Sequence, residues 1–370
     1  MRILITAERL TRTGGREIGV LQLSRTLAHR GHEIDLFYDI GGELETEYRS
    51  FCRSVTQAKM EVRRPRLLLT IGRTVPSAWA ARRHRPDVVF VQRYGEIPFG
   101  VLVGRLARAP VVCHFHGYMY RRKTESLARY VSRFIAVSDD ARRRWVQAGV
   151  NPARIDVVHN GIDPQDYPFG GLAERATARR TLGLPLDAFI VLYYGRLDVE
   201  KGVEVLLEAW RQLGLPPVDA RLVLIGEPVI HPDPLTYARR LRELAPAGCQ
   251  WLAMRRDVVT PLHAADLVVL PSLTAQEGFG RVIIEAMATG RPVVASRVGG
   301  IPEVLSGPYD EFMFDAGDAE GLAELLRNLM DWRHRDPGLG ERCRAHVIER
   351  FTLEHMADGV EQVLLEAVRL

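Results

Sequence analysis

The chain has 370 residues, of which 46% are hydrophobic and 26% are charged. This length and composition are typical of an ordinary globular protein with two domains. The sequence holds no run of about 18 apolar residues, so it predicts no membrane-spanning helix. Its first residues lack the apolar core of a signal peptide, and its four cysteines are too widely spaced to suggest a zinc site or a disulfide framework. We therefore expect a cytoplasmic protein.

The charge is divided unevenly along the chain. Residues 1–165 hold 28 Lys and Arg against 16 Asp and Glu, whereas residues 166–370 hold 22 against 30. The basic half predicts either a peripheral contact with the acidic inner face of a membrane or an ordinary solvated surface, and its densest runs are at residues 63–66, 82–85 and 121–123. Nucleic acid is not expected as a partner, because no aromatic residues are interleaved with these runs.

Predicted strands and helices alternate along the chain. After a strand at 2–6 and an amphipathic helix at 17–29, further short apolar strands are expected at 33–38, 87–92, 111–115 and 134–137. The second half repeats the plan, with strands expected at 189–194, 221–225, 267–270 and 293–296. This alternation predicts an α/β fold of parallel sheets with helices on both faces.

Proline and glycine mark the domain boundary. The stretch NGIDPQDYPFGG at residues 160–171 holds two prolines and three glycines, which interrupt the pattern. It predicts an N-terminal domain at 1–165 and a C-terminal domain at 166–350, followed by an amphipathic helix at 351–370. The stretch 43–78 follows no clear pattern and is left without an assignment.

The most informative segment is AQEGFGRVIIEAMATGRPVVASRVGGIPE, at residues 275–303. A Gly-x-Gly turn opens a helix there, and the free N–H groups at the start of a helix are suited to phosphate. Two carboxylates, Glu277 and Glu285, flank this turn. Because carboxylates accept hydrogen bonds from hydroxyl groups and do not bind phosphate, the combination indicates a sugar nucleotide.

Four segments in this order resemble a known enzyme family. They are MRILI with TGGREIGVLQLSRTLAHRGHEIDLF, then VVHNGIDPQDY, then TLGLPLDAFIVLYYGRLDVEKGVEVLLEAW, and then the segment just described. The resemblance is to the retaining glycosyltransferases of family 4, which have the GT-B fold. It implies an α/β fold of two Rossmann-like, doubly wound parallel-sheet domains that face each other across a cleft. The C-terminal helix of that family often crosses back to the N-terminal domain.

The resemblance implies roles for residues of the C-terminal half. Glu285 would bind the ribose hydroxyls of the donor and Glu277 the hydroxyls of the transferred sugar. The other donor contacts implied are the backbone of Gly278, Phe279, Gly280 and Val258, and the side chains of Arg196 and Lys201. These two cations would neutralise the leaving diphosphate. No Asp-x-Asp triplet occurs in the chain, so we expect a metal-independent site without a cofactor.

The N-terminal half offers a second set of candidates. Strand alternation predicts that His114 and His116 lie on one face of their strand, with Phe115 on the other. By resemblance His116 would approach the reacting sugar carbon, and Gly15 the donor phosphate. The residues expected near the acceptor are Gly14, Arg16, Arg93 and Tyr118.

The function implied is transfer of a hexosyl unit, with retention, from a nucleotide diphosphate sugar to an acceptor hydroxyl. We expect the donor to be a UDP-sugar rather than a GDP-sugar. The leaving diphosphate would itself help to deprotonate the acceptor. The acceptor is left open among lipid-linked, glycan and small polar molecules. Two other functions remain as alternatives: a nucleotide-sugar 2-epimerase of the same fold, and a non-catalytic sensor of sugar nucleotides. A dehydrogenase is disfavoured, because the Gly-x-Gly-x-x-Gly fingerprint is absent.

Overall fold

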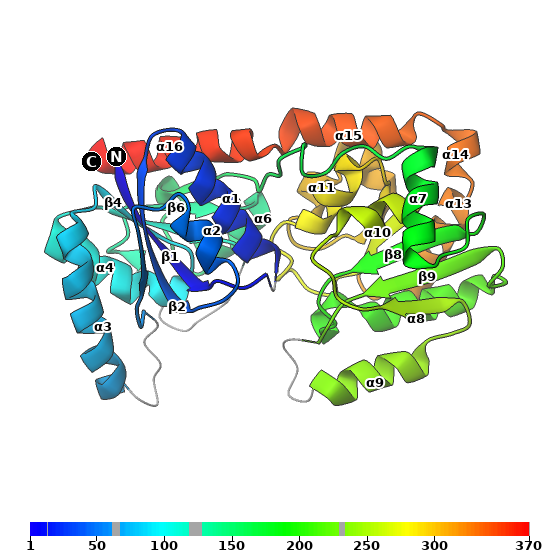
Figure 1. Ribbon diagram of the computed structural model, residues 1–370, viewed down its shortest axis with the longest axis horizontal. Coiled ribbons are helices and arrows are strands. Elements are labelled where there is room, and N and C mark those ends of the chain that lie inside the picture. The colour runs from blue at the N-terminus through cyan, green and yellow to red at the C-terminus, as the bar shows by residue number, and fades with distance from the viewer. Residues whose placement is uncertain (13, 61–66, 118–127, 229–233, 370) are drawn as a thin grey trace. The chain divides into compact units, whose positions relative to one another are not determined.

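The computed structural model describes residues 1–12, 14–60, 67–117, 128–228 and 234–369 (Figure 1). The chain forms two units. The N-terminal unit comprises Met1–Gly161 together with Leu353–Leu370, and the C-terminal unit comprises Ile162–Thr352. The first division thus falls four residues before the boundary expected from the sequence. Ile162 and Thr352 form a parallel bridge, so the chain enters and leaves the C-terminal unit at neighbouring points.

Seven parallel strands form the described sheet of the N-terminal unit, in the order β3-β2-β1-β4-β5-β6-β7. The strands are β1 (Arg2–Arg9), β2 (Glu33–Ile40), β3 (Ser54–Gln57), β4 (Val88–Val91), β5 (Val111–Phe115), β6 (Arg133–Ala136) and β7 (Ile155–Val157). The helices are α1 (Gly15–His29), α2 (Glu45–Arg49), α3 (Leu67–Ala81), α4 (Ile97–Ala107), α6 (Asp139–Gln147) and α16 (Leu353–Arg369). Because the central strands are apolar on both faces, the sheet needs helices on each side.

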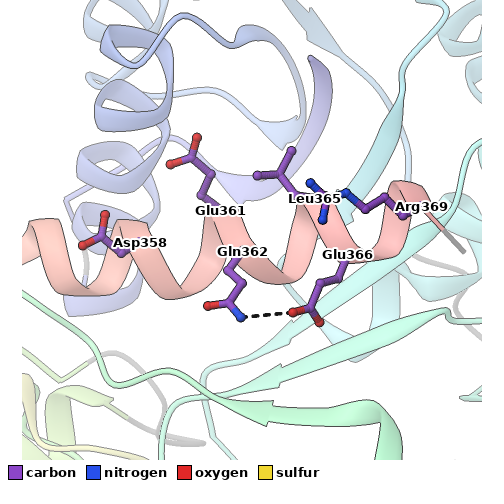
Figure 2. Close-up of a pocket in the computed structure, with 6 residues that line it drawn as sticks. All are labelled: Asp358, Glu361, Gln362, Leu365, Glu366 and Arg369. Carbon is purple, nitrogen blue, oxygen red and sulfur yellow. Dashed lines mark hydrogen bonds between the residues drawn. The ribbon is translucent and has the colours of Figure 1, made fainter.

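Helix α16, at the end of the chain, packs against α1 in the core of the N-terminal unit. Its apolar face, which includes Met356, Val360 and Leu364, is buried in the same core, where α16 also contacts β4, β5 and β6. Arg30 ties the two helices together by an ion pair to Glu361 at 2.8 Å. The other face of α16 is polar and lines a shallow surface hollow, in which Gln362 donates to Glu366 (Figure 2).

Six parallel strands form the described sheet of the C-terminal unit, in the order β10-β9-β8-β11-β12-β13. The strands are β8 (Phe189–Tyr194), β9 (Ala220–Ile225), β10 (Cys249–Leu252), β11 (Leu267–Leu270), β12 (Val293–Ser296) and β13 (Met313–Phe314). The helices are α7 (Leu172–Leu182), α8 (Val203–Leu213), α9 (Pro234–Leu244), α10 (Val259–Ala264), α11 (Arg281–Ala288), α12 (Ile301–Val304), α13 (Ala319–Leu329), α14 (Trp332–Arg335) and α15 (Leu339–Arg350). The predicted α/β architecture of two parallel sheets is confirmed.

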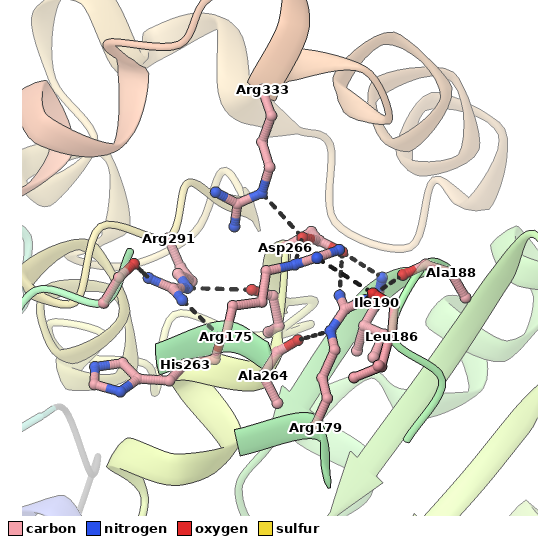
Figure 3. A network of polar contacts seen from close by, with 12 residues as sticks. Arg175, Arg179, Leu186, Ala188, Ile190, His263, Ala264, Asp266, Arg291 and Arg333 are labelled. Carbon is pink, nitrogen blue, oxygen red and sulfur yellow. Dashed lines mark hydrogen bonds and ion pairs between the residues drawn. The ribbon is translucent and has the colours of Figure 1, made fainter. Parts of the chain in front are cut away.

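A buried charge network braces the C-terminal unit just before β11 (Figure 3). The fully buried carboxylate of Asp266 accepts hydrogen bonds from Arg175, Arg179 and Arg333 at distances of 2.6 to 3.2 Å, and also from the backbone of Ile190. Burial alone would raise the pKa of Asp266, but the surrounding guanidinium groups hold it below its usual value. This network joins α7 and α14 to β8 and β11, the two central strands of the sheet.

The strands missing from the sequence analysis are the edge strands. β3 and β7 bound the N-terminal sheet, and β10 and β13 bound the C-terminal sheet. β3 and β10 are only partly covered, so their sequences lack the continuous apolar run that identifies a central strand, and β7 and β13 are only three and two residues long. None of the described helices combines the length and the apolar character needed to cross a membrane.

Candidate functional site

The candidate site of the C-terminal unit lies where two neighbouring parallel strands end. Arg196 and Lys201 follow β8, and the loop that carries Glu277 follows β11, which pairs with β8. The carboxyl ends of parallel strands meet at one edge of a sheet, and ligands of open α/β sheets bind there. The fold therefore brings together residues that are 76 positions apart in the sequence.

Lys201 and Glu277 form an ion pair at the centre of this edge. The Lys201 ammonium lies 2.5 Å from Glu277 Oε2, which also accepts a hydrogen bond from the Ser272 hydroxyl at 3.0 Å. Burial would raise the pKa of Glu277, but Lys201, Ser272 and nearby Arg196 lower it below its ordinary value. The carboxylate is thus ionised at neutral pH. The side chains of Lys201 and Glu277 keep 20% and 13% exposure, so a ligand can reach both groups.

Two glycines let the backbones approach closely enough to build this pair. Gly202 has a left-handed φ of 66°, and a Cβ atom there would lie 2.0 Å from the carbonyl oxygen of Pro271. Gly299 has a φ of 56°, and a Cβ atom there would lie 2.0 Å from the carbonyl oxygen of Glu277. Any larger residue would push these segments apart. The Lys-Gly and Gly-Gly pairs seen in the sequence thus have a steric cause.

Arg196 lies beside this pair and retains 28% side-chain exposure. Its guanidinium contacts the buried carboxylate of Asp198 at 2.8 Å. Its backbone carbonyl accepts a hydrogen bond from Tyr193 at 2.6 Å, which fixes the turn after β8. Asp198 was not singled out in the sequence, although its position two residues after the arginine makes it a natural partner. Arg196 is therefore oriented before any ligand arrives.

Glu285 lies in α11, and both of its carboxylate oxygens already have partners. Arg281 donates to Oε1 at 2.8 Å and Tyr194 donates to Oε2 at 2.7 Å. A carboxylate offers about four lone-pair directions, so a hydroxyl could still bind to it. Sequence reasoning missed both partners, although Arg281 is placed four residues before Glu285 on the same helix face.

The other predicted donor residues lie near the start of α11 or in a separate loop. Gly280 is the N-cap of α11, and Gly278 immediately precedes buried Phe279, whose ring packs edge-on against Phe351. The Phe279 side chain is therefore part of the core. Val258 is half-buried and lies at the N-cap of α10.

The candidate site of the N-terminal unit contains two neighbouring histidines at the end of β5. The rings of His114 and His116 are 4.0 Å apart, which confirms that they share one face of the strand, and Phe115 instead stacks on Trp145. Burial lowers the pKa of His114 to about 3 and that of His116 well below its usual value. Both rings are therefore neutral at pH 7. His116 Nε2 lies 3.0 Å from the side-chain amide oxygen of Gln92, Oε1, to which it donates, and this leaves Nδ1 as an acceptor.

The predicted acceptor-side arginines meet at one carboxylate. Glu8, at the end of β1, lies 2.9 Å from Arg16 and 2.8 Å from Arg93. Burial raises the pKa of Glu8, but these arginines lower it overall. Glu8 had no signal in the sequence beyond its place at a strand end. Gly14 is the N-cap of α1, Gly15 is the first residue of that helix, and Tyr118 lies outside the described residues.

A buried acid lies near these histidines. Glu96 Oε2 accepts from the Thr6 hydroxyl at 2.5 Å and from the Gln92 backbone at 3.2 Å. Burial raises the pKa of Glu96 more than its partners lower it.

Among the described residues, no group of three or more His, Cys, Asp or Glu could hold a metal ion.

Comparison with known proteins accounts for both units. A family model described as Glycosyltransferase Family 4 matches residues 13–166, and a model described as Glycosyl transferases group 1 matches residues 188–331. The chain belongs to glycosyltransferase family 4. It is 28% identical to the D-inositol 3-phosphate glycosyltransferase of Nocardioides sp., over 93% of this chain and 83% of that protein. It is 32% identical to the protein of the same name from Corynebacterium kroppenstedtii, over 59% of this chain but only 49% of that protein.

Solved structures share the fold of this chain. The Anabaena protein Alr3699/HepE, solved in complex with UDP and glucose, is 22% identical and superposes with a TM-score of 0.85 over 99% of both chains. The predicted GT-B architecture of two parallel-sheet α/β domains is therefore confirmed.

Proposed function

We propose that this glycosyltransferase moves a hexosyl unit from a UDP-sugar to an acceptor hydroxyl, with retention of configuration and without a metal. The observation that carries the proposal is the Lys201–Glu277 ion pair beside Arg196 at the carboxyl edge of the C-terminal sheet. This arrangement places an ionised carboxylate next to two oriented cations. A sugar diphosphate needs both, since its hydroxyls seek acceptors and its phosphates seek positive charge.

In this proposal the cations of the C-terminal unit act on the leaving group. As the bond between the sugar and the diphosphate breaks, negative charge develops on the diphosphate oxygens. Arg196 can bind such oxygens with two parallel N–H groups, whereas Lys201 acts as a compact point charge. Glu277 would accept hydrogen bonds from the transferred sugar and so orient its reacting carbon. The diphosphate would then take the proton of the acceptor hydroxyl.

The N-terminal residues suit an acceptor or sugar hydroxyl. His116 is neutral, and its Nδ1 atom is available as an acceptor. Arg9, Arg16 and Arg93 surround Glu8, and Arg16 also pairs with Glu17 at 2.6 Å. Three guanidinium groups thus face two carboxylates, and the positive charge left over could hold an anionic acceptor. The relatives are named for D-inositol 3-phosphate, whose phosphate group is negatively charged. It is therefore the first acceptor to test, and the preference for UDP follows the ligand of the Anabaena structure.

The test is release of nucleotide from a panel of UDP- and GDP-sugars, in EDTA, with and without D-inositol 3-phosphate. We expect one UDP-sugar to release UDP and to give a glycosylated product with the anomeric configuration of the donor. Release only after addition of a divalent metal would overturn the metal-independent site. Inversion of configuration would overturn retention, and a free sugar epimer would indicate the epimerase instead.

Matched lysine variants separate chemistry from folding. Lys201→Ala removes the ion pair of the site, whereas Lys59→Ala removes an exposed ion pair to Asp39 in the N-terminal unit. We expect only Lys201→Ala to abolish release. Equal activity in the two variants would contradict the role given to Lys201.

A further inference from the structure

An open basic hollow lies at the amino edge of the N-terminal sheet. Its lining includes Pro110, Ser132 and Arg154, which stand immediately before or at the starts of β5, β6 and β7. His116 and Arg93 follow the carboxyl ends of strands, so the hollow is at the other edge of the sheet from the residues assigned above. We call it the amino-edge hollow. Its volume is about 740 Å³.

The charge of the amino-edge hollow is not balanced. Its described lining contains five arginines and no carboxylate. Arg133 is neutralised from outside the lining by Asp156 at 2.7 Å and Glu366 at 3.1 Å. Arg154 donates to the backbone carbonyls of Arg129 and Val131. For the other three, no described carboxylate forms an ion pair with the guanidinium. These are Arg105, Arg108 and Arg129.

Tyr130 orders two of these three arginines. The guanidinium groups of Arg105 and Arg129 lie 4.5 and 4.6 Å from the centre of the Tyr130 ring. Such cation–π contacts restrict long side chains that would otherwise be mobile. A ligand that binds ordered arginines loses less conformational entropy than one that must order them itself.

Arg108 occupies a backbone conformation that favours glycine. It caps α4 with a φ of 60°, in the left-handed region where helices commonly end in glycine. A side chain in this region costs on the order of 1 kcal/mol or more. Strain of this kind gathers at binding sites. Arg108 thus adds a third cation to a lining that contains no carboxylate among the described residues.

We propose that the amino-edge hollow binds a ligand with adjacent phosphate groups. A guanidinium group can bind two phosphate oxygens at once, and three such groups without a carboxylate partner in the described part of the chain match a diphosphate better than a single carboxylate. The hollow is large enough for such a group. The phosphates could belong to a free molecule or to a lipid headgroup, because both present the same oxygens to Arg105, Arg108 and Arg129.

The test is calorimetric titration with pyrophosphate of the full chain and its variants. Pyrophosphate can also bind the cations of the C-terminal unit, so the titrations are repeated in an Arg196→Ala background. Arg108→Gly removes one cation and relieves the left-handed residue, so it should not lower the melting temperature. We expect it to weaken pyrophosphate binding about tenfold, the usual effect of one charged hydrogen bond. Arg105→Gln should weaken binding as well.

A matched control exists in the same unit. Arg85 is also exposed and also has a left-handed φ, of 49°, but it does not line the hollow. Arg85→Gly should leave pyrophosphate binding unchanged. Sedimentation with cardiolipin vesicles, whose headgroup carries two phosphates, compared with phosphatidylcholine vesicles, distinguishes the two sources of phosphate. Loss of sedimentation in Arg108→Gly indicates a headgroup, and pyrophosphate binding without any sedimentation indicates a free ligand. The proposal is wrong if Arg108→Gly and Arg85→Gly behave alike with both probes.

Discussion

Two pairs of buried ionisable groups, one pair in each unit, behave in opposite ways. In the C-terminal unit, Asp266 and Glu277 are buried acids whose pKa values are lowered by neighbouring cations. In the N-terminal unit, burial lowers the pKa of His114 to about 3 and raises that of Glu96. These two acids of the C-terminal unit therefore stay charged, whereas His114 and Glu96 of the N-terminal unit favour their neutral forms. The cations that keep Glu277 charged suit a diphosphate, whereas neutral donors and acceptors suit hydroxyl groups.

The largest expected effect comes from removing the charge at the centre of the network in Figure 3. Asp266→Asn leaves Arg175, Arg179 and Arg333 without their shared counter-charge. We expect a loss of about 3 to 5 kcal/mol in the free energy of unfolding, as for other buried ion pairs that lose one partner. Urea denaturation measures this loss. The control is Asp336→Asn, which breaks an exposed pair with Arg342 and should cost less than about 1 kcal/mol. Equal costs would remove the contrast between the units.

The next effect concerns activity. Glu277→Gln keeps the shape of the side chain but removes the charge that Lys201 compensates. We expect nucleotide release to fall about 10²- to 10³-fold, which is typical for a preorganised polar contact in an active site. Glu204→Gln, which loosens an exposed pair with Arg240 in the same unit, should retain full activity. Retained activity in Glu277→Gln would contradict the role of the ionised carboxylate.

A smaller effect is a dependence of stability on pH. The pKa of His114 is about 3 in the folded state but near 6.5 when the chain is unfolded, so the unfolded state binds more protons between these values. Stability is therefore full above about pH 6.5 and falls as the pH drops, by up to about 1.4 kcal/mol per pH unit for this group. His114→Phe, which can stack on Phe90, should flatten this slope. Thermal unfolding between pH 7 and pH 5 measures it, and an unchanged slope would mean that His114 is not held neutral.

The smallest effect is expected at Glu96. Burial raises the pKa of Glu96 and so favours its neutral form, and Glu96→Gln keeps the shape of the side chain without a charge. Its amide oxygen can still accept from Thr6 and from the Gln92 backbone. We expect less than about 1 kcal/mol of lost stability. A loss of several kcal/mol in urea denaturation would show that Glu96 is needed as a carboxylate, and would weaken the comparison.

The sequence predicted the central strands well, for a physical reason. Strands at 111–115, 189–194, 267–270 and 293–296 are buried on both faces, so their apolar runs have the same limits as the observed strands. At β3 and β10 no residue is fully buried, and no apolar pattern distinguishes these edges from loops. These edge strands are defined by their pairing with a neighbouring strand, and the local sequence does not encode that pairing.

The candidate residues could be located from the sequence, but not their partners. The motifs identified Glu277 and Lys201 separately, whereas their ion pair depends on the pairing of β8 with β11. Glu8 and the amino-edge hollow were missed for the same reason. The runs at 63–66 and 121–123 lie outside the described residues, and the arginines of the hollow are scattered through the sequence. Spatial clusters of this kind leave no local pattern.

Binding of UDP tests the central claim most directly. Calorimetry would compare the full chain with Lys201→Ala, each in EDTA and in Mg²⁺. The account predicts equal UDP affinity in EDTA and in Mg²⁺ for the unmodified chain. It also predicts affinity about tenfold weaker in Lys201→Ala, the usual cost of one charged hydrogen bond. Binding that requires Mg²⁺, or that is unaffected by loss of Lys201, would contradict a donor site built on the Lys201–Glu277 pair.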